Sequence, residues 1–215
     1  MTEKQSAPRG RRALHVACIL LVALIVAGGV GALGIALRWW RGPYPRTMRD
    51  LSWKLGFVEP AYNFGEVVPG RIYRSCRPDE RLYRYLHNRY GVRHVVRLFE
   101  VNDEIPMPPR DLGWDATVLQ WHNHVLPPRD ELRQVLAAFD SNSPVLIHCY
   151  SGADRTGYAV GAYRVLRQGW SVERAVEEME RFEYRRSVKP WYARHLAELA
   201  RERNAAPVAP EQRPR

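Results

Sequence analysis

The sequence predicts an α/β fold in which a central, mostly parallel sheet is flanked by helices. Strand-like and helix-like patterns alternate along the chain after residue 60, which is typical of this class. A short apolar run at residues 144–148 (PVLIH) has the composition of a strand buried at the centre of a parallel sheet. The 215 residues leave room for one such domain together with shorter flanking segments.

Each element is indicated by its own local pattern. The predicted strands, which are rich in β-branched and apolar residues, are residues 71–74, 92–99, 116–121 and 144–148. The predicted helices, whose apolar residues recur three or four positions apart, are residues 79–90, 129–139, 156–168, 171–182 and 190–203. Gly169 stands between the third and fourth of these helices, where it can end the third.

An apolar run at residues 16–37 precedes this domain. It carries no charged side chain and, as a helix, is long enough to cross a hydrocarbon core of about 30 Å. Trp39 and Trp40 follow the run, where indole rings favour the headgroup region of a membrane. The sequence therefore predicts a basic tail at residues 1–12 and a single transmembrane anchor at residues 13–40.

Two other interpretations of the apolar run stay open, a cleaved signal peptide and a buried core helix. Cations flank both ends of the run and leave its orientation open, although the short basic tail slightly favours a main domain outside the cytoplasm. Residues 41–60 are predicted to be a connector and residues 61–204 the main domain. The Pro-rich residues 205–215 are predicted to be a disordered tail.

The chain is basic, with 33 Lys and Arg against 23 Asp and Glu and a net charge of +10. Such a charge raises the possibility of nucleic-acid binding. The arginines, however, are interspersed with acidic residues along the predicted helices, and the sequence contains no nucleic-acid recognition motif. We therefore predict no nucleic-acid partner. Three cysteines are too few for a fold built on disulfides.

The residues that can do chemistry are concentrated at 148–157 (HCYSGADRTG), between a predicted strand and a predicted helix. A loop in this position directs backbone N–H groups and the positive end of the helix dipole toward one point, where an anion can bind. The same field favours the thiolate form of Cys149, which is the nucleophilic form. Gly152 permits the turn, Arg155 can bind two phosphate oxygens, and Thr156 can donate a hydrogen bond to the Cys149 sulfur.

This loop resembles the CX5R signature loop of the cysteine-dependent protein tyrosine and dual-specificity phosphatases. Residues 63–100, with their IYRS-x-x-P segment, and residues 164–180 resemble the flanking parts of compact bacterial members. The resemblance implies a dual-specificity phosphatase-like fold and hydrolysis through a phosphocysteine, with no metal and no cofactor. An inactive, phosphate-binding scaffold with the same fold is the alternative.

The resemblance also implies roles for individual residues of the predicted phosphatase domain. Cys149 would be the nucleophile and Arg155 the phosphate-binding catalytic residue, assisted by Thr156 and Asp154. The residues implied to bind the phosphate are Tyr150, Ser151, Gly152, Ala153, Asp154 and Arg155. The residues implied to support the loop are His148, Arg74 and Ser75.

The proton donor for the leaving group is not evident from the sequence. In this family it is usually an aspartate on a separate loop, but residues 121–128 (WHNHVLPP) contain no acidic side chain. Asp154, inside the signature loop, is the first candidate, and capping of the following helix is its alternative role. His122 and His124 are alternative general acids, because imidazole titrates in the useful range.

The expected partners are a phosphorylated protein or lipid substrate and a membrane. Protein substrates are favoured, because relatives that act on highly charged inositol headgroups often carry lysine in the loop, where this chain has Ala153. The predicted anchor favours lipid substrates, since it would hold the site near a membrane. Cys76 is expected to be a small apolar core residue, with a disulfide to Cys149 under oxidation as the alternative.

Overall fold

The computed structural model describes residues 51, 53–99 and 107–205. The predicted membrane anchor at residues 13–40 and nearly all of the predicted C-terminal tail lie outside these residues. Within the described part of the chain, no helix combines the length and the apolar character that a membrane span requires. The anchor therefore stays a prediction.

Five strands form one sheet in the order β1-β2-β5-β3-β4. They are β1 (Gly65–Val68), β2 (Ile72–Ser75), β3 (His94–Arg97), β4 (Asp115–Val118) and β5 (Val145–His148). Strands β2, β5, β3 and β4 pair in parallel, and the edge strand β1 pairs with β2 in antiparallel orientation. The prediction of an α/β fold with a mostly parallel sheet is confirmed.

The observed elements differ from the predicted ones at one edge of the sheet and at some ends. β3 and β4 have four residues each and are shorter than the predicted strands. β1 is not among the predicted strands, because a register shift between Glu66 and Val68 interrupts the alternating pattern that marks a strand. Two short helices, α3 (Val58–Tyr62) and the 3-10 helix Arg110–Leu112, are too short to show helical periodicity in the sequence.

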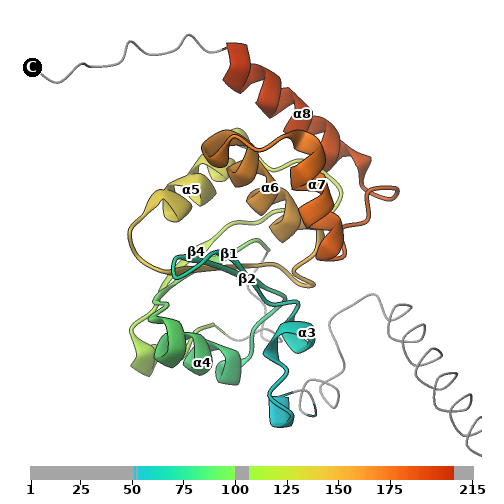
Figure 1. Ribbon diagram of the computed structural model, residues 1–215. Helices are drawn as coiled ribbons and strands as arrows, with labels where there is room; N and C mark the ends of the chain where they lie inside the picture. The colour runs from blue at the N-terminus through green and yellow to red at the C-terminus, as the bar shows by residue number, and fades with distance from the viewer. Residues whose placement is uncertain (1–50, 52, 100–106, 206–215) are drawn as a thin grey trace, which may run out of the picture. The chain divides into compact units, whose positions relative to one another are not determined.

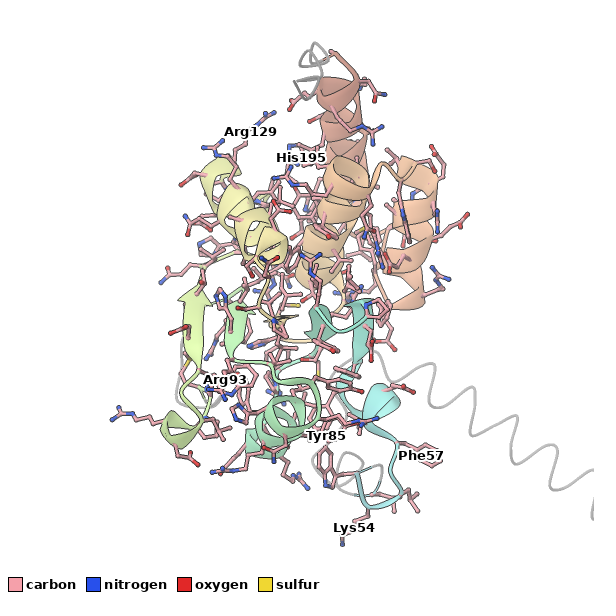
Figure 2. All side chains as sticks on the ribbon, turned by 60° about the vertical axis from the view of Figure 1, so that its left-hand side comes forward. Lys54, Phe57, Tyr85, Arg93, Arg129 and His195 are labelled. Atoms are coloured by element: carbon pink, nitrogen blue, oxygen red, sulfur yellow. The ribbon has the colours of Figure 1, made fainter. Side chains whose placement is uncertain are left out.

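Helices cover both faces of the sheet (Figure 1). One face carries α4 (Glu80–Tyr90), and the other carries α5 (Arg129–Asp140), α6 (Asp154–Gln168), α7 (Val172–Arg181) and α8 (Pro190–Ala205). Figure 2 shows Tyr85 on α4 and His195 on α8 on opposite sides of the sheet. Two apolar cores result, a larger one under α5–α8 and a smaller one under α4.

The helix ends follow the chemistry of their capping residues. Asp79 accepts a hydrogen bond from the Leu82 N–H at 3.1 Å where α4 begins, and Gly91 ends α4 with a φ of 66°. α6 begins at Asp154, before the predicted start, and its N-cap residue Ala153 makes no side-chain capping bond. The alternative role of Asp154 as a helix cap is therefore wrong.

A buried ion pair fixes α7 against α6. Arg164 donates from Nε and Nη2 to the two carboxylate oxygens of Glu178, at 2.8 and 2.6 Å. Both side chains are buried, and this two-point geometry permits little sliding of one helix along the other. Because α7 ends at Arg181, the ion pair also sets the position of the next residue, Phe182, which contacts the candidate site.

Candidate active site

The loop at residues 149–155, called the signature loop below, lies at the carboxyl end of the parallel strands. β5 pairs with β2 as far as His148 and Ser75. Beyond the strands, the Arg77 N–H donates to the Tyr150 carbonyl at 3.1 Å. The signature loop therefore stays beside the chain that follows β2, which is the IYRS segment of the sequence and its continuation.

Gly152 lets the signature loop approach this neighbouring chain closely. Its φ is +70°, a conformation that other residues adopt at a cost. A Cβ atom at this position would lie 2.7 Å from backbone atoms of both Ser75 and Cys76. Glycine is thus required here by the backbone conformation and also by the lack of space.

The signature loop has backbone donors to offer to an anion. Between described residues, no backbone hydrogen bond uses the N–H groups of residues 150–153. α6 begins directly after them, and the N–H groups of its first turn have no partner inside the helix. Together with the helix dipole, these donors can bind a phosphate group beside Cys149, which is a buried free thiol.

Arg74 lies buried beneath the signature loop. Its Nη2 donates to the Gly152 carbonyl at 2.6 Å, and its guanidinium carbon lies 3.8 Å from the centre of the Phe182 ring. Burial lowers the pKa of Arg74 to about 10, against the opposing effect of the charges on Glu178 and Cys149. The side chain is therefore cationic at neutral pH and brings a buried positive charge to the support of the signature loop.

Asn63 and Gly65 hold this support in place. The Asn63 amide nitrogen donates to the carbonyls of Ser151 and Phe182, both at 3.2 Å. A Cβ atom on Gly65 would lie 2.6 Å from the Phe182 ring, so the ring packs directly on the backbone of β1. Phe182 is thereby held in place beside Arg74.

An open pocket of about 280 Å³ lies beside the signature loop. Its wall consists of Phe99, Gln120, Trp121, His122, Asn123, Tyr150 and Arg155. Arg155 Nη1 donates to the carbonyls of Leu98 and Trp121, at 3.2 and 2.9 Å, and these bonds orient its guanidinium in the wall. Of the residues that sequence analysis assigned to phosphate binding, Tyr150 and Arg155 line the pocket; the neighbouring Cys149 is not part of its wall.

Asp154 is not part of the pocket wall and is bound to two cations. Its carboxylate accepts hydrogen bonds from Lys189 Nζ at 2.6 Å and from the backbone and side chain of Arg185, both at 3.2 Å. Burial alone would raise the pKa of Asp154, but the hydrogen bonds and charges of Lys189 and Arg185 lower it below its ordinary value. Lys189 is itself buried and also donates to Asn123 Oδ1. Asp154 is therefore an ionised carboxylate with its oxygens already occupied.

His148 and Thr156 are buried next to the signature loop. His148 Nδ1 lies 3.4 Å from the Cys149 carbonyl oxygen. Burial, with a smaller effect of the charges on Arg97 and Arg155, lowers the pKa of His148 to about 3, so its imidazole is neutral at physiological pH. The Thr156 hydroxyl has no hydrogen-bond partner among the described residues, and the predicted bond to the Cys149 sulfur is not formed.

The remaining candidates are separated by the structure. His122 lines the pocket, whereas His124 is exposed and is not part of the wall. Cys76 is buried in the core under α4 and forms no disulfide with Cys149, which packs in the core on the other face of the sheet. Ser75 Oγ donates to the carbonyl of Cys76 at 2.7 Å, which fixes the backbone against which Gly152 packs.

Comparison with known proteins decides the family. A family model described as "Tyrosine phosphatase family" matches residues 58–196, which is more than half of the chain. The chain belongs to this family. The expected resemblance to cysteine-dependent tyrosine and dual-specificity phosphatases is thereby confirmed, and the chain is a cysteine-dependent phosphatase.

Individual relatives carry two different descriptions. The dual specificity protein phosphatase TpbA of Pseudomonas aeruginosa is 30% identical over 181 residues, which are 78% of this chain and 75% of that protein. The inositol diphosphatase DSP1 of Oryza sativa subsp. japonica is 44% identical over 148 residues, which are 59% of this chain and 60% of that protein. A crystal structure of P. aeruginosa TpbA matches with a TM-score of 0.55 and 27% identity, covering 68% of this chain and 94% of that one.

Sequence analysis of this phosphatase missed three residues that hold the site, Asn63, Phe182 and Lys189. Asn63 acts on a carbonyl 88 positions away, and Lys189 on a carboxylate 35 positions away. No local pattern marks Asn63 or Phe182. The sequence does offer one indication of a special role for Lys189. Lysine is rare in this chain, where it occupies three positions, and arginine is used at the many other cationic positions.

The buried His148 makes this phosphatase less stable in acid. Because its pKa is lowered to about 3, the unfolded chain binds a proton below about pH 6.5 that the folded chain does not bind. The stability is thus complete above that pH and is lost as the pH falls toward 3. From pH 7 to pH 5 we expect a loss of about 2 kcal/mol in the free energy of unfolding from this residue.

Urea unfolding at the two pH values measures this loss, and His148→Gln is expected to remove it. His94 and His195 also have a pKa lowered by burial, so part of the acid sensitivity will remain in that variant. His124→Gln, on the surface, is the matched control and should retain the full loss. Equal acid sensitivity of His148→Gln and the wild type would show that another group is responsible.

Proposed function

We propose that this phosphatase hydrolyses phosphotyrosine in proteins through a phosphocysteine on Cys149. The observation that carries the proposal is the pocket wall, in which the aromatic rings of Phe99, Trp121 and Tyr150 accompany one guanidinium among the described residues, that of Arg155. Aromatic walls pack well against a phenol ring. One guanidinium and the free N–H groups of the signature loop suit one phosphate group.

The proposed reaction has two steps. In the first, the Cys149 thiolate attacks phosphorus, and the S–P bond forms while the P–O bond to the tyrosine oxygen breaks. Arg155 and the backbone N–H groups of the signature loop bind the three non-bridging oxygens, over which the charge of the transition state is spread. In the second step, water attacks the phosphocysteine, so that inorganic phosphate leaves and the thiolate is regenerated. The buried positive charge of Arg74 stabilises the negative charge that returns to the Cys149 sulfur as the S–P bond breaks.

An inositol phosphate is the second candidate substrate. The relative in Oryza sativa is described as an inositol diphosphatase and is 44% identical to this chain over the matched residues. A substrate with several phosphates would need several cations, whereas the described part of the pocket wall offers one guanidinium, that of Arg155. We therefore place the inositol phosphates, and the phospholipids that carry such headgroups, second.

One experiment tests both the intermediate and the substrate class. The purified full-length chain is given a phosphotyrosine peptide, a phosphoserine peptide, inositol phosphates and vesicles containing a phosphoinositide, and kcat/KM is measured for each. The phosphotyrosine peptide is expected to be the best substrate, and acid quenching of labelled substrate should trap a phosphoenzyme in the wild type but not in Cys149→Ser. A preference for an inositol phosphate would overturn the substrate class, and failure to trap label would overturn the intermediate.

The membrane anchor belongs to the same proposal. Residues 16–37 are apolar and uncharged, which supports a single transmembrane helix at residues 13–40, with the catalytic domain outside the cytoplasm. Alkaline extraction of membranes and protease protection of a C-terminal tag measure attachment and sidedness. A soluble product that lacks the N-terminal segment would instead identify a cleaved signal peptide.

A further inference from the structure

The first step of this reaction needs a proton donor at the pocket. The phenolate of tyrosine is a poor leaving group unless it is protonated as the P–O bond breaks. Among the described residues of the pocket wall, two side chains, those of His122 and Tyr150, can carry a proton there and also lose it. The Tyr150 ring is stacked on the guanidinium of Arg77, at 4.4 Å. His122 is exposed to solvent, so it can exchange protons between the two steps.

Asp154 does not fit this role. Its carboxylate oxygens accept hydrogen bonds from Lys189 Nζ and from two nitrogens of Arg185. Both partners are cations, so the carboxylate is ionised and has no proton to give. Asp154 also lies outside the pocket wall.

The residues on both sides of His122 are connected by hydrogen bonds to side chains of the first turn of α6. On one side, Arg155 Nη1 donates to the Trp121 carbonyl at 2.9 Å. On the other side, the Asn123 side chain accepts a hydrogen bond from Lys189, which in turn is bound to Asp154. Asp154 and Arg155 are adjacent in the sequence, so the same turn that carries the phosphate-binding guanidinium also places His122.

Lys189 is well fixed for this purpose. It is buried, with 1% of its surface exposed, and its backbone carbonyl accepts a hydrogen bond from the Tyr184 hydroxyl at 2.6 Å. A lysine ammonium can donate three hydrogen bonds, and two of these go to Asp154 and Asn123. Lys189 therefore links the signature loop to the pocket wall.

From this geometry we infer that His122 is the general acid and base of the phosphatase, and that Asp154 and Lys189 are positioning residues that hold it. The inference rests on the proposed function. In the first step the His122 imidazolium gives its proton to the leaving phenolate oxygen as the P–O bond breaks and the S–P bond forms. In the second step the neutral imidazole takes a proton from the attacking water, which becomes part of inorganic phosphate, and the S–P bond breaks to leave the Cys149 thiolate.

The test compares two substrates that differ in their need for a proton. Dinitrophenyl phosphate has a leaving group that departs as an anion, whereas phenyl phosphate has one that must be protonated. In the full-length chain, His122→Gln is expected to lower kcat/KM for phenyl phosphate by about 100-fold or more, and for dinitrophenyl phosphate by less than about threefold. His124→Gln is the matched control and should leave both values unchanged.

Two variants break the hydrogen bond between Lys189 and Asn123 through which the positioning residues act. Asn123→Ala and Lys189→Met should each lower kcat for phenyl phosphate by about tenfold with little change in KM, and should spare dinitrophenyl phosphate. A merely structural role would lower activity toward both substrates together. Asn123→Ala removes the same link from a partly exposed position, so it gives an answer even if Lys189→Met does not fold.

The outcomes separate this inference from the proposed function. If the wild type hydrolyses dinitrophenyl phosphate no faster than Cys149→Ser, the proposed function itself fails. If the wild type is active but His122→Gln matches it on phenyl phosphate, or loses activity equally on both substrates, the role of His122 is overturned. A selective loss in Asp154→Asn or Tyr150→Phe that equals or exceeds the loss in His122→Gln would also overturn it.

Discussion

Arg155→Lys is expected to lower kcat toward a phosphotyrosine peptide by about 10³-fold without unfolding the protein. The guanidinium is held by two carbonyls through a single nitrogen, Nη1, which donates to Leu98 and Trp121 at 3.2 and 2.9 Å. Its other nitrogens have no hydrogen-bond partner among residues 51, 53–99 and 107–205, and they can form the two parallel hydrogen bonds that a phosphate accepts. Lysine keeps the positive charge but has no planar fork, so it can hold neither the carbonyls nor the phosphate in this way.

Steady-state kinetics and thermal unfolding together check this expectation. A change in kcat with little change in melting temperature would locate the loss in the transition state and not in the fold. Arg194→Lys, a substitution of the same kind on the exposed face of α8, is the matched control and should behave as the wild type. If Arg155→Lys retained activity within about tenfold, charge alone would be sufficient and the bidentate geometry would not matter.

The place of the signature loop between β5 and α6 could be predicted from the sequence because the patterns that mark it are local. Cys149 and Arg155 are separated by five residues, and the strand before them and the helix after them have clear patterns. The strand and helix types were correct for the same reason, since each has its own periodicity. The edge strand β1 was not predicted, because its pairing shifts register between Glu66 and Val68. This shift interrupts the alternation of apolar and polar residues that marks a strand.

The support beneath the signature loop could not be predicted, because it depends on the tertiary fold. Arg74 could be assigned a supporting role because it lies in the IYRS segment, which resembles a segment of the family. Its packing on Phe182, however, depends on the position of α7. The contact of Asn63 with Ser151 joins residues 88 positions apart. Neither asparagine nor phenylalanine has a local preference that would single out Asn63 or Phe182 for this role.

Asp154 illustrates how the tertiary environment can reverse an interpretation based on the sequence. Its place in the signature loop made it the first candidate for the general acid, and a carboxyl group in a low-dielectric site can indeed have a raised pKa. Burial acts in that direction here, but Lys189 and Arg185 outweigh it and lower the pKa of Asp154. Both cations lie more than 30 positions further along the chain, as the separations of 31 and 35 residues show. Sequence patterns near Asp154 therefore carry no information about its protonation state.

Gly152→Ala is expected to be the most damaging substitution in the signature loop outside its charged and nucleophilic residues. Two costs add. An alanine at a φ of +70° is strained by about 1 kcal/mol or somewhat more, and a Cβ 2.7 Å from the backbone of Ser75 and Cys76 overpacks the site by about 2 kcal/mol. The free energy of unfolding should fall by about 3 kcal/mol, which lowers the melting temperature by about 10 °C in a chain of this size.

Activity should fall further than stability alone requires. The Gly152 carbonyl accepts the hydrogen bond from Arg74 at 2.6 Å, so a loop that moves away from β2 also breaks this bond. A displacement of about 1 Å in a catalytic loop costs about 100-fold in rate. We therefore expect at least that loss in kcat/KM at a temperature where the variant remains folded, measured beside its unfolding curve.

Gly91→Ala separates the two costs. Gly91 has nearly the same conformation, with a φ of +66°, but a Cβ there would meet no atom within 4 Å. It should therefore lose about 1 kcal/mol of stability from backbone strain and keep its activity, since it lies at the end of α4 and not at the site. If the two variants were equally destabilised, the close approach of the signature loop to β2 would contribute nothing, and the backbone conformation alone would explain the glycine.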